Sequence, residues 1–227
     1  MINWYNNKIK MIITKIGHSC LIVEENGTKV LVDPGSYAFM ENPAGIEQIK
    51  SIAAIFISHE HPDHCDLEKL PQILMTNDYP NIYTNEAVAQ LLKSNGIKSE
   101  ILPAGDTVTI KDIAVKAVDC PHGLLPEGVP TPDYIGFVFN ETLFHPGDCI
   151  NPKTEVKAKV LALPIVAPWT ATRDAVAFAK KLKPAITFPI HDSILRVPDP
   201  MRMMVKRSFD FLKMDFRPMK AGEELEF

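Results

Sequence analysis

The chain has few cysteines, and none of them is paired in a CxxC motif. Four cysteines in 227 residues are too sparse for the disulfide framework of a small secreted scaffold, so reduced thiols are expected. The N-terminal stretch lacks the apolar core of a secretory signal, and no run of about 18 apolar residues indicates a membrane span. We therefore expect a cytoplasmic protein that does not insert into a membrane.

A strong excess of charge of one sign is also missing. The 24 basic residues are balanced by 28 acidic ones, whereas nucleic-acid binding draws on clustered Lys and Arg. The GxSxG motif of serine hydrolases and the phosphate-binding GxxxxGK[ST] motif are absent as well. Nucleic acid is thus not an expected partner. We expect a small-molecule substrate, and a homo-oligomer stays open.

The length suits one domain over residues 1–227, large enough to bury a substantial core. Because a strand-like run begins at Met11, residues 1–10 are expected to be a peripheral extension. Runs rich in Val, Ile and Phe predict strands at residues 12–16, 21–23, 30–32, 53–57, 113–118, 135–139, 161–163 and 186–190. Apolar residues at helical spacing predict helices at residues 86–93, 173–183 and 201–213. This mixture indicates layered sheets covered by helices.

One weak internal similarity is visible. Residues 20–33 are interpreted as strand, turn, strand and aspartate, and residues 135–148 show the same order. Two related halves of the chain would explain the similarity. Chance resemblance between two hairpins explains it equally well at this point.

A cluster of polar side chains directly follows the predicted strand at 53–57. His59, His61, Asp63 and His64 lie within six residues. Imidazole nitrogen and carboxylate oxygen are the donors that zinc and related first-row metals accept, and four such groups can surround more than one ion. The alternative is a polar surface loop, which so dense a pattern makes the weaker hypothesis.

Three further candidates follow predicted strands. His122, Asp148 and His191 each come after an apolar run. A lone histidine after a strand is more often a hydrogen-bonded loop residue, and Gly147-Asp148 is a common turn pair. Together, however, the three residues predict a metal site assembled where several strands end.

The combination of His59-x-His61-x-Asp63-His64 with the later His122, Gly147-Asp148 and Pro189-Ile190-His191 resembles the metallo-β-lactamase superfamily. Leu31-Val32-Asp33-Pro34-Gly35 is similar to its early aspartate motif, and the resemblance covers nearly the whole chain. Gly17-His18-Ser19 and residues 179–184 are most similar to bacterial hydrolases related to ascorbate-6-phosphate lactonase.

The resemblance implies an α+β fold, a four-layer αββα sandwich with a dinuclear site at one edge of the sheets. By this resemblance His59, His61 and His122 hold one divalent ion, and Asp63, His64 and His191 hold the other. Asp148 then bridges the ions, and Asp33 orients the ligand loop through hydrogen bonds. Zinc is the expected metal, with manganese or iron as alternatives.

Two ions that share a hydroxide favour hydrolysis of a small ester, lactone or phosphodiester. Asp148 and Asp63 are the expected catalytic carboxylates, and Asp63 could orient or deprotonate water if one ion is weakly held. Two alternatives stay open. One is a di-iron oxidoreductase of the same fold, although that branch usually has glutamate at the position of His61. The other is a non-catalytic, metal-dependent binding protein.

Several other residues are weaker candidates. His18 is either a neighbour of the site or an ordinary turn residue, and His145 is expected to position the loop before Asp148. Trp169 and Arg173 could contact substrate, but a packed aromatic and a solvated helix residue are the more economical interpretation. Thiol ligation by a nearby cysteine, Cys65, Cys120 or Cys149, is conceivable but unnecessary. Residues 123–128 could form a flap.

Overall fold

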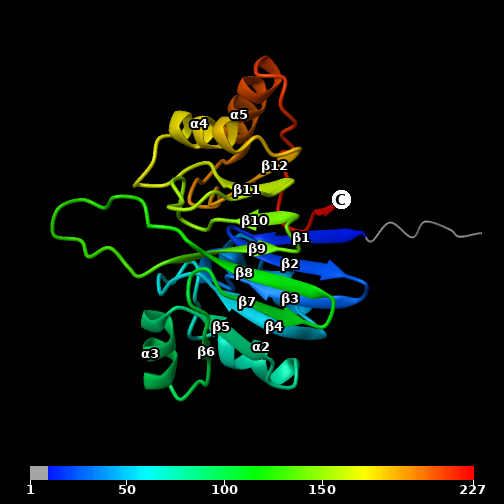
Figure 1. The fold of residues 1–227 in the computed structure, drawn as a ribbon, viewed down its shortest axis with the longest axis vertical. Coiled ribbons are helices and arrows are strands. Elements are labelled where there is room, and N and C mark those ends of the chain that lie inside the picture. Colours follow the sequence, from blue (N-terminus) through cyan, green and yellow to red (C-terminus); the bar gives the residue numbers. More distant parts are fainter. Residues whose placement is uncertain (1–9) are drawn as a thin grey trace, which may run out of the picture.

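The computed structural model describes residues 10–227. Its strands form two mixed sheets, shown in Figure 1. Sheet A, in spatial order, contains β13 (Glu224–Glu226), β1 (Met11–Gly17), β2 (Cys20–Glu25), β3 (Thr28–Val32), β4 (Ile52–Ile57), β5 (Asn81–Thr84) and β6 (Glu100–Ile101). Sheet B contains β12 (Ile186–Ile190), β11 (Val160–Pro164), β10 (Leu143–His145), β9 (Ile135–Phe139), β8 (Ile113–Asp119) and β7 (Thr107–Ile110).

The central strands β4, β9, β11 and β12 are buried along almost their whole length, because each sheet is covered on both sides. Along β4, Ala54 and Phe56 point into a core shared with sheet B, whereas Ile55 and Ile57 belong to a second core on the outer face. In the central core the Phe56 ring lies 5.4 Å from that of Phe137, measured between centroids. Burying such a side chain contributes about 1.5–3 kcal/mol, so the inter-sheet contacts hold the two sheets face to face.

Helices complete the outer layers. Those of the first half cover sheet A and those of the second half cover sheet B (Figure 1). They are α1 (Ser36–Glu41), α2 (Leu70–Thr76) and α3 (Glu86–Ser94) on sheet A, and α4 (Thr172–Leu182) and α5 (Asp199–Phe211) on sheet B, with a 3-10 turn at Pro43–Gln48. The order of layers is helix, sheet, sheet, helix. The predicted αββα sandwich is therefore confirmed.

The two sheets repeat one pairing pattern. In sheet A, β1 and β2 are antiparallel, as are β2 and β3, and β3, β4 and β5 then run parallel. In sheet B, β8, β9, β10, β11 and β12 show the same succession. The weak similarity of residues 20–33 and 135–148 thus coincides with equivalent hairpins, which supports two related halves over chance. Asp33 and Asp148 follow equivalent strands, β3 and β10.

The strand pairings direct the carboxyl ends of β1, β3, β4, β5 and β6 in sheet A, and of β8, β10, β11 and β12 in sheet B, to one edge of the sandwich. The residues of the predicted site follow six of these strands: β1, β3, β4, β8, β10 and β12. The connection from β8 to β9 also starts at this edge, and Figure 1 shows it in green, projecting from the body of the domain. Among residues 10–227, none of the helices combines the length and hydropathy needed to span a bilayer. The predicted N-terminal extension lies, except for Lys10, outside the described residues.

Candidate metal centre

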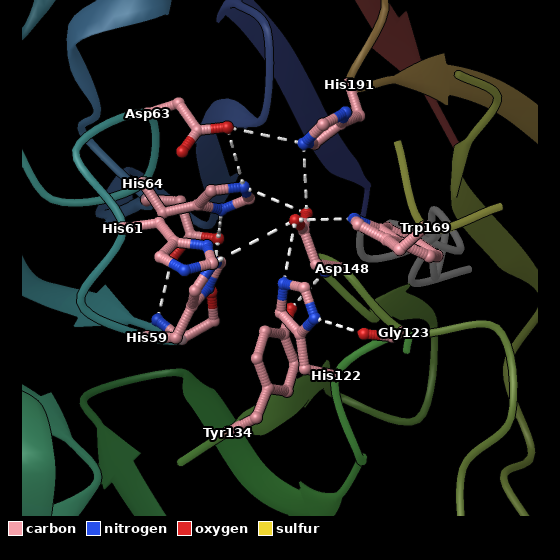
Figure 2. Close-up of polar contacts among 12 residues, drawn as sticks. His59, His61, Asp63, His64, His122, Gly123, Tyr134, Asp148, Trp169 and His191 are labelled. Carbon is pink, nitrogen blue, oxygen red and sulfur yellow. Dashed lines mark hydrogen bonds and ion pairs between the residues drawn. The ribbon is translucent and has the colours of Figure 1, made fainter. Parts of the chain in front are cut away.

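The residues directly after these strands converge on one point. His59 and His64 come from the loop after β4, His122 from the loop after β8, Asp148 from the loop after β10, and His191 directly follows β12. Figure 2 shows their side chains turned toward one another around Asp148. The sequence-predicted ligands are thus brought together.

The close approach of Gly35 to the ligand loop explains part of the early Asp-Pro-Gly motif. A Cβ at Gly35 would lie 1.8 Å from the carbonyl oxygen of Asp63, so no larger residue fits. Asp33 itself has a positive φ of 44°, as do His18 at 48° and His191 at 59°. Left-handed backbone is costly for such residues and is typical of functional sites.

The side chains form two groups. His59, His61, His122 and Asp148 offer ligand atoms that all lie within 4.8 Å of one another. The second group consists of His18, Asp63, His64 and His191 and satisfies the same distance. Imidazole and carboxylate donors in this number suit zinc and other first-row metals. Each group could therefore hold one ion.

Asp148 lies between the two groups. Its Oδ1 is 2.9 Å from His64 Nε2 and 3.3 Å from His191 Nε2. Its Oδ2 is 3.4 Å from His122 Nε2 and 3.9 Å from His59 Nε2. One carboxylate oxygen thus faces each group, which is the arrangement that a bridging ligand needs.

Three of the proposed ligand histidines are held by Nδ1 and leave Nε2 free. His122 Nδ1 donates to the carbonyl oxygen of Gly123 at 2.6 Å, and His191 Nδ1 donates to that of Val166 at 2.7 Å. His64 Nδ1 donates to Asp33 Oδ2 at 2.8 Å. The Nε2 atoms of these three histidines are buried and face carboxylate oxygens of Asp148 without forming a hydrogen bond. Buried polar atoms without partners are rare, and anchored Nδ1 with free Nε2 is typical of metal-binding histidines.

The two groups differ in charge. Burial lowers the pKa of His59 well below its ordinary value, and burial together with His122 lowers the pKa of His61. Burial also opposes charge on His191, but Asp148 and Asp63 outweigh it and raise the pKa of His191 to about 10. The same carboxylates raise the pKa of His64 well above its ordinary value against the effect of burial. Without ions, cationic His64 and His191 therefore compensate the two carboxylates.

His18 belongs to the site but both of its nitrogens are engaged. Nε2 lies 3.2 Å from Asp63 Oδ2, and Nδ1 lies 2.7 Å from Ser193 Oγ. Burial, with a contribution from His191, lowers the pKa of His18 to about 4. The neutral ring is suited to donating to Asp63 and accepting from Ser193. His18 is thus placed to orient Asp63, and an ordinary turn residue is the weaker interpretation.

The structure places the remaining candidate residues differently with respect to the two ligand groups. His145 contacts the carbonyl oxygen of Ser19 at 2.8 Å and joins neither ligand group, as expected for a residue that positions a loop. Trp169 lies at the site, where its indole Nε1 donates to Asp148 Oδ2 at 3.1 Å. Arg173 is 86 % exposed and pairs with neighbouring Asp174. The structure therefore supports Arg173 as a solvated helix residue rather than a substrate contact.

The thiols are not among the ligand atoms. No cysteine of the described chain is part of either group, and all four cysteines are free and buried. Burial raises the pKa of Cys65 to about 12. A hydrogen bond with Cys149 and burial raise the pKa of Cys120 well above its ordinary value. Protonated thiols are poor ligands, which leaves the histidines and aspartates as the donor set.

Two residues that support Asp33 and Asp148 were missed from the sequence. Ser58 donates to Asp33 through its backbone N–H at 2.8 Å and through its hydroxyl at 2.7 Å, and its Oγ lies 3.0 Å from His59 Nδ1. Tyr134 donates to the carbonyl oxygen of Pro146 at 2.7 Å and accepts a hydrogen bond from the backbone N–H of Asp148. Ser58 adjoins the ligand cluster and could have been found there. Tyr134 lies twelve residues after His122 without any motif.

Comparison with known proteins agrees with this geometry. Protein Rv0786c of Mycobacterium tuberculosis is 31% identical over 96% of this chain and 100% of its own length. A UPF0173 metal-dependent hydrolase of Thermoplasma acidophilum is 28% identical over 77% of this chain and 80% of its own length. The solved structure of Igni18, a metallo hydrolase from Ignicoccus hospitalis, has a TM-score of 0.72 at 20% identity and covers 96% of this chain and 98% of that one.

A family model described as the beta-lactamase superfamily domain matches residues 12–191. This span runs from β1 to the last proposed ligand, His191, and so includes every strand that contributes to the site. None of the relatives named above identifies the lactonase branch, which stays a prediction. Because the match covers most of the chain and the αββα fold is present, the protein belongs to the metallo-β-lactamase superfamily.

Proposed function

We propose that this protein is a metal-dependent hydrolase that cleaves a small ester, lactone or phosphodiester with two divalent ions, most simply zinc. The observation that carries the proposal is the position of Asp148, whose two oxygens face two separate ligand groups. A relative described as a metal-dependent hydrolase supports it. The small-molecule substrate follows from the same assignment.

The donor set fits the ions. His59, His61 and His122 would hold one ion, and Asp63, His64 and His191 the other, with Asp148 shared between them. When bound, two such ions activate water and stabilise the negative charge that develops during hydrolysis. No serine or cysteine nucleophile is then required.

The protein also supplies a carboxylate that orients the attacking water. Asp63 keeps 17% of its side chain exposed, and its Oδ2 is held between His18 and His191 at 3.2 and 3.3 Å. Burial opposes ionisation of Asp63, but His64 and the hydrogen bond from His18 outweigh it and lower its pKa. The ionised, partly exposed carboxylate is thus able to orient attacking water through a hydrogen bond, whereas its lowered pKa makes it a weak proton acceptor.

The proposal is tested by metal quantification combined with a hydrolysis screen of lactones, thioesters, phosphodiesters and β-lactams. The wild-type protein is expected to hold close to two ions per chain and to hydrolyse at least one class. His61→Ala removes one proposed ligand from a half-buried position and should lose both metal and activity. Asp174→Asn changes an exposed carboxylate outside both groups, so it should retain both.

The screen also separates the alternatives. Bound iron together with redox activity after anaerobic reduction would favour the di-iron oxidoreductase. Two bound ions without turnover of any class would favour a binding protein. Full metal occupancy in His61→Ala would contradict the ligand assignment itself.

A further inference from the structure

A cavity of about 490 Å³ adjoins the second ligand group. It lies between α1 and the loop that follows β12. One wall consists of Tyr37, Met40 and Glu41, and the other of residues 193–196 and 198. Neither wall contains a proposed ligand, so the cavity is a separate feature of the same edge of the sandwich.

His18 connects the cavity to the metal centre. Ser193, which lines the cavity, has its hydroxyl 2.7 Å from His18 Nδ1, and the opposite nitrogen of the same ring is 3.2 Å from Asp63 Oδ2. The ring of Tyr37, from the other wall, has its centroid 5.3 Å from that of His18. A single imidazole thus separates the lining of the cavity from a proposed ligand.

The negative charge in the lining is already compensated. Glu41 Oε1 accepts from Arg202 Nη2 at 3.2 Å, and Glu41 Oε2 accepts from the backbone N–H of His18 at 2.8 Å. Arg196, by contrast, is exposed and forms no ion pair with any residue between 10 and 227. The free charge of the cavity is therefore positive.

The rest of the lining is mainly apolar. Met40, Ile194, Leu195 and Pro198 contribute aliphatic surface, and Tyr37 contributes an aromatic ring. Pockets of this size that combine apolar walls with one or two polar groups are typical of small-molecule sites. A guanidinium in such a place binds carboxylate or phosphate with two parallel hydrogen bonds.

The segment that leads from His191 to Ser193 is held in place by a buried ion pair. Asp192, directly before Ser193, is buried and accepts from Lys15 Nζ at 2.7 Å and from Arg202 Nε. Lys15 is itself fully buried and also donates to the carbonyl oxygen of Pro189 at 2.9 Å. The loop therefore leaves His191 along a fixed path, which positions Ser193 beside His18.

We propose that this cavity selects substrates which carry, apart from the bond that is cleaved, an anionic group on a small apolar body. Arg196 pairs with the anion, and Met40, Leu195 and Tyr37 contact the apolar part. The proposal rests on the proposed hydrolase function, since it assigns the substrate class of the same site.

The first test compares two esters that differ only in charge, the monophenyl ester of adipic acid and the phenyl ester of adipamic acid. Wild-type protein should hydrolyse the charged ester with a kcat/KM about fivefold or more above that of the neutral one. Arg196→Gln should remove most of this preference by raising KM for the charged ester, because the contact is remote from the reacting bond. Arg207→Gln, an exposed arginine on α5, is the matched control and should keep the preference.

The second test measures binding without turnover, using 4-phenylbutyrate and 4-phenylbutyramide titrated into the full chain. If 4-phenylbutyrate binds, and if its binding weakens in Arg196→Gln but not in Arg207→Gln, the result supports the proposed anion site in the cavity. This conclusion holds even if no ester is hydrolysed, and in that case only the hydrolase proposal fails. If Arg196→Gln hydrolyses the esters with the same charge preference as wild type, the cavity proposal is overturned, but the hydrolase proposal is not affected. Equal binding of both probes overturns it as well.

Discussion

Asp33 and Asp148 lie on opposite sides of the His64 ring. Asp33 Oδ2 accepts from Nδ1 at 2.8 Å, and Asp148 Oδ1 lies 2.9 Å from Nε2. The two aspartates follow equivalent strands of the two halves, yet they have different surroundings. Asp33 is surrounded by donors from Ser58 and His64, whereas Asp148 faces unpartnered imidazole nitrogens. One aspartate therefore orients a ligand, and the other is proposed to be one.

Replacing Asp33 tests the orienting role. In Asp33→Asn the amide cannot accept from both Ser58 and His64 as the carboxylate does, so the His64 ring loses its fixed tautomer. We expect metal affinity to fall about 10–100-fold, the usual effect of losing such a partner. Competition with a chromogenic chelator measures the affinity, and circular dichroism checks the fold. Wild-type affinity in a folded variant would show that Asp33 is not needed.

Metal binding should release protons. Because the pKa of His191 is raised to about 10 and that of His64 is also raised, both rings are protonated at neutral pH without ions. Metal must displace these protons, so its affinity should rise with pH until about pH 10. Calorimetry in buffers of different ionisation enthalpy measures the protons released. A heat that does not depend on the buffer would contradict the assignment.

The same charges should act on the stability of the metal-free protein. A raised folded-state pKa means that the stabilising contribution of His191 is fully present below its unfolded pKa of about 6.5 and is lost as the pH rises through about 10. His59 and His61, with lowered pKa values, act in the opposite direction and destabilise the fold as pH falls below about 6.5. Urea unfolding of the metal-free protein across this pH range measures the net effect of these histidines on the free energy of unfolding. Chelated wild type and His191→Gln should differ most below about pH 6.5 and converge as the pH rises through about 10.

The buried ion pair of Lys15 and Asp192 should be important for stability. Lys15→Met leaves Asp192 with one cation fewer in a site without solvent access, and removing one partner of a buried pair costs about 3–5 kcal/mol. Urea unfolding of metal-free protein should show a loss of this size. Lys206→Met removes a partly exposed pair with Asp210 on α5 and should cost much less. Equal losses in the two variants would be inconsistent with a buried network.

Gly123 should determine the position of Trp169. A Cβ at this glycine would lie 2.1 Å from Trp169 Cε3, so Gly123→Ala must displace the indole and weaken its hydrogen bond to Asp148. We expect turnover to fall at least about tenfold, because small displacements of positioning groups are costly. In a Trp4→Phe background, where Trp169 is the remaining tryptophan, the emission spectrum reports the displacement. Unchanged emission and activity would show that the ring tolerates the methyl group.

The sequence was informative where chemistry and strand order coincide. Each proposed ligand comes shortly after an apolar run, and parallel strands must deliver such residues to a common edge, so their convergence could be predicted. The eight predicted strands and three predicted helices are all present, with boundaries that differ by a few residues. Weak elements escaped prediction because they are short or exposed: α1 and α2 have six and seven residues, and β6 has two.

Other features depend on contacts between distant parts of the chain. Lys15 follows Met11 and Ile13 on the inner face of β1, and its burial depends on an ion pair with Asp192, 177 residues further along the chain. Tyr134 and Ser193 contact the site from loops that carry no motif. For Arg173 the sequence favoured a solvated helix residue over a substrate contact, and the first turn of α4 does direct this side chain to solvent.

The most direct measurement is anomalous X-ray diffraction from crystals grown with zinc. We expect two metal peaks per chain, one among His59, His61 and His122 and the other among Asp63, His64 and His191, with Asp148 contacting both. A single peak, or peaks away from these side chains, would contradict the dinuclear assignment on which the proposed hydrolysis depends.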